Sequence, residues 1–257
     1  MRKRFALLLP LLPLLVAAAT QPATTRPTPP ASQPKPAAAS QPTDLYRLTP
    51  DDFFKLPQAS QRIQKIAVDV DFLEAAIFHQ TNRQRTANKL PTFQHSFAMT
   101  LMARRHSTEM STLQFFDHTS PTPANRTLVD RLKNVGVTNV TAGENIAVLP
   151  AKEMGSGRYI THDPIDGNET WYDEDTGKKI DYYTYQELSE AVATKWKNSP
   201  PHWKNIIDPQ FKFLGVGVAR GPYDEKKQDS FYMTQNFAGA LVASAETKAK
   251  AALQPKP

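Results

Sequence analysis

The chain contains no cysteine in 257 residues. This absence excludes a disulfide scaffold, a thiolate zinc site, an iron–sulfur cluster and a cysteine nucleophile. It also excludes a lipid anchor of the lipoprotein type, because that lipid is attached to a cysteine. Whatever part of the chain folds must therefore be stabilised by its hydrophobic core alone.

The first 19 residues have the layout of a secretory signal peptide. Three basic residues at 2–4 precede an uncharged run at 5–19 that ends in three alanines, which suit a cleavage site. A membrane anchor is the alternative, but the run is shorter than the roughly 20 residues of a spanning helix. Pro10 and Pro13 would also interrupt such a helix. We expect cleavage near Ala19, no membrane span in the mature chain, and a location that is secreted, periplasmic or in the cell envelope.

Two flanking segments are too poor in large apolar residues to join a core. Residues 20–45 hold seven prolines among Ala, Ser, Thr and Gln, which predicts a disordered linker. Residues 244–257 are small and polar and are predicted to be a disordered tail, with a stretch that could be helical near Ala245–Leu253. The folded domain is predicted at 46–243, with an N-terminal extension at 46–68 and an inserted β-hairpin excursion at 151–183.

The formal charge of +6 lies outside this domain. Residues 1–19 carry +3, the linker +1 and the tail +2, whereas residues 46–243 have 23 basic and 23 acidic side chains. A nucleic-acid partner requires a basic surface on the folded domain. The neutral domain therefore argues against nucleic-acid binding.

Hydrophobic periodicity predicts four helices and two late strands. The helices are expected at 69–87, 94–114, 125–135 and 184–196, and the strands at 215–220 and 231–237, joined by a polar loop. Residues 140–148 have a mixed, partly β-like pattern. The third helix has a predicted inner stripe of Leu128, Val129, Leu132 and Val135, and Gly136 follows where a helix ends. Pro200 and Pro201 should prevent the fourth helix from continuing.

Three polar residues stand out by their sequence context. His118 lies in a turn after the second helix, and His202 follows the fourth helix. Glu144 is framed by a glycine and apolar residues. Segments at the ends of elements are where a scaffold presents functional groups. The other four histidines are interpreted as structural or solvated.

Six short motifs occur in order along the chain. They are Asn82-x-x-Arg85, Phe116-Asp-His-Thr-Ser-Pro121, Gly143-Glu-Asn-Ile146, Trp196-x-x-Ser-Pro-Pro-His202-x-x-Asn-Ile206, Phe213-x-Gly-Val-Gly-Val218 and Thr234-Gln-Asn-Phe237. Together they resemble the CAP superfamily, the cysteine-rich secretory, antigen 5 and pathogenesis-related group, in its bacterial cysteine-free branch. The resemblance covers about residues 73–239.

The resemblance implies an α+β fold, a three-layer α-β-α sandwich, with a cleft where His118, His202 and Glu144 converge. A second glutamate of the eukaryotic branch falls on Ser199, so this chain departs from the full set. Two imidazoles and one carboxylate suit zinc or another divalent cation, with water completing the shell. Asn145 is expected to orient the Glu144 loop. Ser199 is expected to cap a helix end, and a nucleophilic role beside His202 is the alternative.

Several functions stay open at this point. The favoured hypothesis is an exported, non-catalytic module whose cleft binds a divalent metal or a small extracellular ligand at His118, Glu144, His202, Ser199 and Asn145. A metal-dependent hydrolase or peptidase acting on cell-wall or extracellular polymer, with Glu144 activating water, is the first alternative. A lipid or sterol carrier is the second. The same polar residues could instead form a hydrogen-bonded network that locks loops together.

Overall fold

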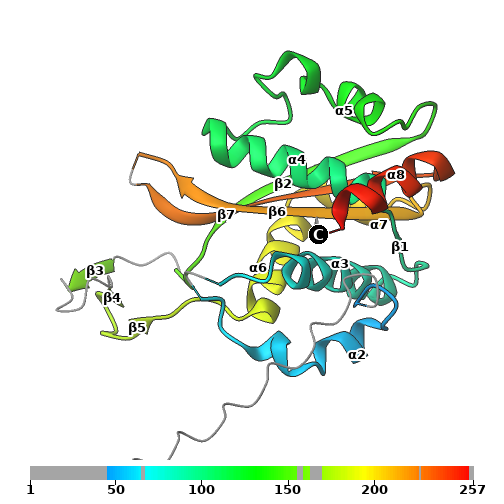
Figure 1. Ribbon diagram of the computed structural model, residues 1–257. Helices are drawn as coiled ribbons and strands as arrows, with labels where there is room; N and C mark the ends of the chain where they lie inside the picture. Colours follow the sequence, from blue (N-terminus) through cyan, green and yellow to red (C-terminus); the bar gives the residue numbers. More distant parts are fainter. Residues whose placement is uncertain (1–44, 65–66, 155–158, 163–169, 226, 255–257) are drawn as a thin grey trace, which may run out of the picture. The chain divides into compact units, whose positions relative to one another are not determined.

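A computed structural model of the chain describes residues 45–64, 67–154, 159–162, 170–225 and 227–254 (Figure 1). The predicted signal peptide and the predicted linker, apart from Leu45, lie outside these residues and stay predictions. In the part of the chain that is described, no helix is both long and apolar enough to cross a membrane.

A four-stranded sheet with the strand order β1-β6-β7-β2 forms the middle layer. Strands β6 (Phe213–Tyr223) and β7 (Gln228–Ala238) form a long antiparallel hairpin. Strand β2 (Ala142–Pro150) pairs antiparallel with β7 at one edge, and the short β1 (Gln94–His95) pairs parallel with β6 at the other. Both late strands are longer than predicted, because the polar segment expected to be loop continues the pairing as far as Tyr223 and Gln228.

Helices cover both faces of this sheet (Figure 1). On one face lie α4 (Phe97–Leu113), α5 (Leu128–Asn134) and α8 (Ala243–Leu253). On the other lie α3 (Val70–Ala87), α6 (Tyr185–Lys197) and α7 (Pro200–Ile207). The expected α+β fold, a three-layer α-β-α sandwich, is confirmed.

Two glycines on one face of β6 allow α4 to pack with its backbone against the strand. A Cβ at Gly215 would lie 2.0 Å from the backbone nitrogen of Thr100, and one at Gly217 would lie 2.1 Å from the backbone carbon of Ala103. Residues two apart face the same side of a strand. Helix α4 is therefore seated on the sheet at a distance that no larger residue permits.

Two helices start three residues later than predicted. Gln94 and His95 pair with β6, so α4 begins only at Phe97, behind the Ser96 cap. The third helix starts at Leu128 behind a capping box, after the 3-10 turn η2 (Pro123–Asn125). Val129 is 56% exposed, so the prediction that it belongs to the inner stripe is wrong. Gly136 has a φ of 79° and ends α5, as predicted.

The paired prolines begin a helix as well as following one. Helix α6 ends at Lys197, and Pro200 and Pro201 occupy the first positions of α7. Proline is favoured there because the first helical N–H groups have no partner within the helix. His202 consequently lies in the first turn of α7, not in a loop.

The stretch expected to be helical near Ala245–Leu253 is helix α8 (Ala243–Leu253), and it packs on the domain instead of forming a disordered tail. Ala245 and Ala249, one turn apart, are buried against α4. The carboxylate of Glu246 accepts hydrogen bonds from the Phe97 N–H at 2.8 Å and the Ser96 hydroxyl at 2.5 Å. Two buried alanines and one carboxylate thus contact α4 from this helix.

The N-terminal extension and the insertion have their own structure. Helix α2 (Pro50–Phe54) and the 3-10 turn η1 (Pro57–Ser60) bury Phe53 against α3. The insertion contains the short antiparallel strands β3 (Tyr159–His162), β4 (Thr170–Asp173) and β5 (Lys179–Ile180). The hairpin predicted there corresponds to β4 and β5.

Candidate functional site

Glu144 lies on the edge strand β2, where it pairs with Asn236 of β7. Its side chain is buried on the sheet face that carries α4 and α5. The Asn236 amide, oriented so that its oxygen accepts from the Ala103 N–H, places its nitrogen 3.1 Å from one Glu144 oxygen. The carboxylate is therefore held in a polar pocket between strand and helix.

Arg131 of α5 neutralises this carboxylate. Its Nη2 atom lies 2.7 Å from each of the two Glu144 oxygens. Its Nη1 atom donates to the backbone carbonyls of His118 and Asn125, both at 3.0 Å. The guanidinium is itself buried, and its Nε has no partner among the described residues. One side chain thus fixes the carboxylate and both ends of the loop that carries His118.

His118 is the exposed member of this group. Its Nδ1 lies 2.9 Å from Glu144 Oε1, and its side chain is 54% exposed. A hydrogen bond from the Thr119 N–H to the Asp117 carboxylate at 2.6 Å shapes the turn around it. The predicted contact between His118 and Glu144 is present, with the imidazole at the surface and the carboxylate behind it.

His106 of α4 lies beneath the same carboxylate. Its Nε2 is 3.1 Å from the Asp117 carbonyl oxygen and 3.9 Å from Glu144 Oε1. Burial lowers the pKa of His106, and its Nδ1 has no partner among the described residues. We infer that His106 is neutral and that its N–H holds the loop that precedes His118.

The surroundings of Glu144 favour its ionised form. Burial alone would raise the pKa of Glu144, but the His118 hydrogen bond and the charge of Arg131 outweigh it and lower that pKa. A charge-assisted hydrogen bond to a buried carboxylate is stronger than one to a neutral acceptor. Glu144 is therefore a fixed anion.

Asn145, the next residue, points to the opposite face of the sheet, because side chains alternate along a strand. Its Nδ2 donates to the His202 carbonyl and to Gln235 Oε1, both at 3.1 Å. Its Oδ1 accepts from Asn205 at 2.8 Å, and Asn205 also donates to the Glu144 carbonyl at 3.2 Å. Asn145 thus ties α7 to the edge strand, whereas the Glu144 loop that it was expected to orient is part of strand β2.

Ser199 does not cap α7 with its side chain, so the prediction that its hydroxyl caps a helix end is wrong. A capping oxygen accepts a hydrogen bond from the N–H group at the second or third helical position. Pro201 occupies the second position of α7 and has no N–H group to donate. The Ser199 hydroxyl instead lies 2.7 Å from His202 Nδ1. Burial lowers the pKa of His202, and the charges of His118 and Lys195 lower it further.

The site therefore straddles the free edge of β2. His118 and Glu144 approach from the α4 side, and His202, Ser199 and Asn145 approach from the α7 side. The sequence did not identify Arg131, His106, Asn205 and Gln235 as parts of the site. One signal could have indicated Arg131. It lies three positions after Leu128, and this spacing places a charged side chain on the inner face of the helix. Asn205 and Gln235 were present in the motifs without a role.

The two imidazoles share a chemical arrangement. Each has Nδ1 bound to a protein oxygen, and Nε2 has no partner among the described residues. Each Nε2 can thus accept a proton, donate one or ligate a metal, depending on the tautomer. The described residues contain no group of three or more His, Cys, Asp or Glu side chains arranged to hold a metal ion.

Comparison with known proteins identifies relatives of this chain. The uncharacterized protein YkwD of Bacillus subtilis (strain 168) is 28% identical over 170 residues, which are 66% of this chain and 48% of YkwD. The chain thus spans about half the length of this curated relative. Among solved structures, an extracellular protein containing an SCP domain from Bacillus anthracis matches with a TM-score of 0.43 and 28% identity, over 65% of this chain and 40% of that one.

Two further structures are more distant in sequence. An outer surface protein of Borrelia burgdorferi matches with a TM-score of 0.43 and 12% identity, over 68% of this chain and 97% of that one. A cysteine-rich secretory protein of Staphylococcus aureus matches with a TM-score of 0.41 and 14% identity, over 67% of this chain and 40% of that one. The profile described as the cysteine-rich secretory protein family, CAP, matches residues 78–237, which is more than half of the chain. The chain therefore belongs to the CAP family.

Proposed function

We propose that this chain is an exported binding module that presents the imidazoles of His118 and His202 to a divalent metal ion or a small extracellular ligand. The observation that carries the proposal is the half-exposed His118 imidazole held at 2.9 Å by a buried, charge-compensated carboxylate. A side chain fixed on one nitrogen and open on the other is prepared to bind. The signal-peptide pattern supports export.

His202 supports the proposal in the same way. Its Nδ1 is engaged by the Ser199 hydroxyl at 2.7 Å, so its ring orientation is also set by a neighbour. Histidines that bind metals commonly bond through their second nitrogen to a carboxylate or another oxygen, which fixes the tautomer. Here Glu144 would serve His118 as that outer partner, and Ser199 would serve His202.

The residues fit a metal ion only in part. The two Nε2 atoms could hold one, and a bound ion would act as a Lewis acid towards a further ligand. Glu144 does not fit as a direct ligand, since Arg131 Nη2 lies 2.7 Å from both of its oxygens. A cation chelated by the carboxylate would need that position, and a guanidinium beside it would repel the ion. Zinc or another divalent cation bound by the two histidines therefore remains a proposal.

The hydrolase alternative receives less support. A general base must be able to take a proton from water near neutral pH. Both oxygens of Glu144 are already paired with Arg131, and its pKa is lowered. These features favour a carboxylate that orients His118, and hence a non-catalytic site.

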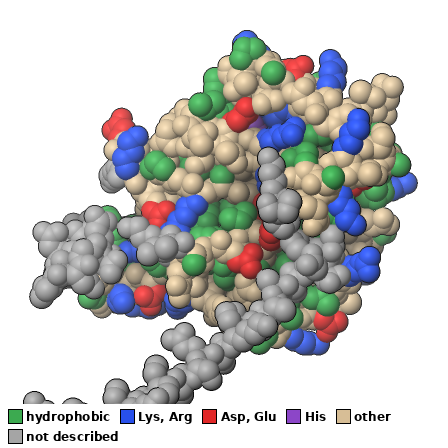
Figure 2. Space-filling model, viewed as in Figure 1, with side chains coloured by type: hydrophobic (Ala, Val, Ile, Leu, Met, Phe, Trp, Pro, Cys, Tyr) green, Lys and Arg blue, Asp and Glu red, His purple; other side chains and the backbone are tan. Residues whose placement is uncertain are grey.

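The charge distribution bears on the other partner classes. Acidic and basic side chains are both spread over the face shown in Figure 2, and residues 46–243 have no net charge. This distribution does not favour a nucleic-acid partner. A role as a lipid or sterol carrier and binding of a cell-wall component both stay predictions. No contact described at the His118 site favours either of them.

Calorimetric titration of the purified protein with Zn²⁺ tests the proposal. We expect saturable binding that is lost in both His118→Ala and His202→Ala. Glu144→Gln, which keeps an acceptor for the His118 N–H, should weaken binding by at most about 10- to 100-fold, as for other outer partners. His162→Ala, in the small sheet, is the matched control. If the His118 and His202 variants bind like the wild type, the metal part of the proposal is wrong. A screen of small ligands with the same variants then tests the other part.

A further inference from the structure

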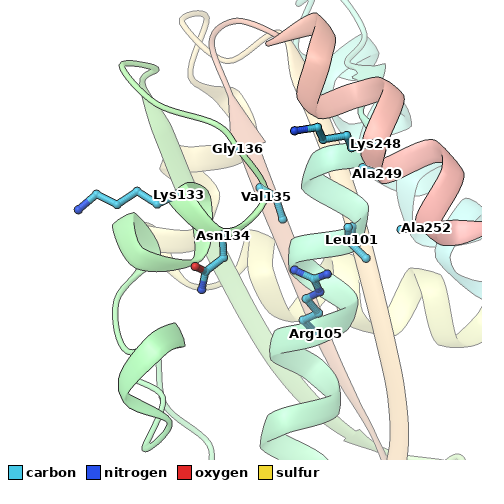
Figure 3. Close-up of a pocket in the computed structure, with 9 residues that line it drawn as sticks. All are labelled: Leu101, Arg105, Lys133, Asn134, Val135, Gly136, Lys248, Ala249 and Ala252. Carbon is cyan, nitrogen blue, oxygen red and sulfur yellow. The ribbon is translucent and has the colours of Figure 1, made fainter.

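A cavity of about 360 Å³ lies on the α4 face of the domain (Figure 3), and neither His118 nor Glu144 lines it. It is bounded by α4, by the turn that ends α5 and by α8. The residues that line it are Leu101, Arg105, Lys133, Asn134, Val135, Gly136, Lys248, Ala249 and Ala252. Its volume is at the lower end of the roughly 300–1,000 Å³ of small-molecule sites.

The lining combines an apolar floor with positive charge. Leu101, Val135 and Ala249 supply apolar surface, and no acidic residue lines the cavity. In Figure 3 the side chains of Arg105 and Lys248 point into the space between the helices, whereas that of Lys133 extends away from it. In the described part of the chain, none of these three basic side chains forms an ion pair. Their charge is therefore available to a ligand.

The cavity is held open by fixed contacts. The nearby acidic residue of α8, Glu246, is committed to Ser96 and Phe97 at the start of α4. Ala245 and Ala249 are buried, and Ala245 lies 3.8 Å from where a Cβ of Gly136 would be. The left-handed Gly136 lets the α5 turn pass close to α8. The cavity walls are therefore close to one another, and the carboxylate of Glu246 is engaged by Ser96 and Phe97.

We propose that this cavity binds a small organic anion, namely a carboxylate with a short apolar body. The guanidinium of Arg105 matches a carboxylate in geometry, and Lys248 adds a second positive charge. The apolar floor accepts a short hydrocarbon chain. Helix α8 lies outside residues 78–237, so this site depends on a segment beyond the part that matches the family. It is separate from the function proposed for His118 and His202.

Titration of the full chain with octanoate, followed by NMR chemical shifts of the backbone amides, tests this proposal. We expect saturable shifts in α4, α8 and the α5 turn, with a Kd of about 1 mM or lower. Arg105→Gln and Lys248→Gln should each weaken binding by about three- to tenfold, and Ala252→Trp should fill the cavity and abolish it. Lys133→Gln, whose side chain points away, and Lys197→Gln, on the opposite face, should change affinity less than twofold.

The controls separate this ligand from other sources of the same chemistry. Octylamine, with the opposite charge, should not bind, and acetate, without the apolar chain, should bind at least tenfold more weakly than octanoate. Binding of phosphatidylglycerol vesicles without binding of octanoate would overturn the proposal in favour of a membrane surface. Equal octanoate affinity in the wild type and in an Arg105→Gln/Lys248→Gln variant with an unchanged melting temperature would also overturn it.

Discussion

The Nη2 atom of Arg131 lies 2.7 Å from both carboxylate oxygens of Glu144, in the position that a chelated cation would occupy. Both side chains are buried. The same guanidinium donates to the backbone carbonyls of His118 itself and of Asn125, which follows in the same loop region. The charge that stabilises Glu144 is thus supplied by the chain itself, and it also determines where His118 stands.

Removal of Arg131 should therefore lower the free energy of unfolding more than removal of an ordinary surface charge. Breaking a buried ion pair by removing one partner typically costs about 3–5 kcal/mol, because the other charge stays buried. We expect this loss for Arg131→Leu, measured by urea unfolding. The Arg131→Leu/Glu144→Leu variant should be more stable than Arg131→Leu alone. Strictly additive losses in the double variant would contradict the view that the two residues act as a pair.

The helices and the late strands were predictable because their signals are local: hydrophobic periodicity located α3, α6 and both strands. The α-β-α arrangement was implied by the resemblance to the CAP family, and Glu144, which was expected in a loop, lies on strand β2. Arg131 was not found because its role depends on a carboxylate 13 residues away, which no local pattern records. Helix α8 was misjudged for a similar reason, since its docking depends on a contact between Glu246 and Ser96, 150 residues apart.

The face of the sheet to which each site residue points could be deduced only once β2 was known to be an edge strand. Glu144 and Asn145 are neighbours in sequence, but they lie on opposite faces and hold different loops. The sequence grouped them in one cleft. The separation of His118 from His202 around the strand edge is therefore a consequence of strand pairing that the sequence motifs do not contain.

Two helices that each have a hydroxyl residue at the N-cap position should respond differently to loss of that hydroxyl. Thr127 caps α5 in a capping box, so Thr127→Ala should cost about 1 kcal/mol of unfolding free energy. Ser199 makes no cap, so Ser199→Ala should cost clearly less. Urea unfolding of the two variants under the same conditions checks this. An equal loss for both would show that the Ser199 hydroxyl stabilises α7 more than its contact with His202 indicates.

Acid should weaken the docking of the N-terminal extension. Burial lowers the pKa of His79 to about 4, although its Nε2 bonds to the Leu45 carbonyl at 2.8 Å. The unfolded chain, with a histidine pKa of about 6.5, binds the proton more readily than the folded one. Neutral, buried His79 thus makes its full contribution to the unfolding free energy above pH 6.5. This contribution is lost as the pH falls towards 4, which lowers the unfolding free energy by up to about 3 kcal/mol.

An NMR titration of the His79 ring protons checks this prediction directly. We expect a midpoint near pH 4, together with increased amide exchange in α2 at low pH, since Phe53 stacks on the His79 ring. His79→Gln should flatten the dependence of the unfolding free energy between pH 4 and 6.5. A midpoint at pH 6 or above would mean that the ring is not buried in its neutral form.

Glu246 should decide whether α8 stays on the domain. Its carboxylate accepts from the Phe97 N–H at 2.8 Å and from the Ala98 N–H at 3.3 Å, at the positive end of α4. Glu246→Ala should therefore cost about 1–2 kcal/mol, the range for loss of a helix cap. Glu246→Gln, which keeps an acceptor without the charge, should fall between Glu246→Ala and the wild type.

Hydrogen exchange distinguishes loss of this cap from a general loss of stability. In Glu246→Ala the amides of α8 and of the first turn of α4 should lose protection, while those of β6 and β7 should keep theirs, because the central hairpin does not depend on α8. Glu225→Ala, which removes an exposed carboxylate at the turn between β6 and β7, should leave both regions unchanged. If α8 in Glu246→Ala remains as protected as in the wild type, its docking is due to the buried Ala245 and Ala249 alone and the carboxylate contributes only to the start of α4.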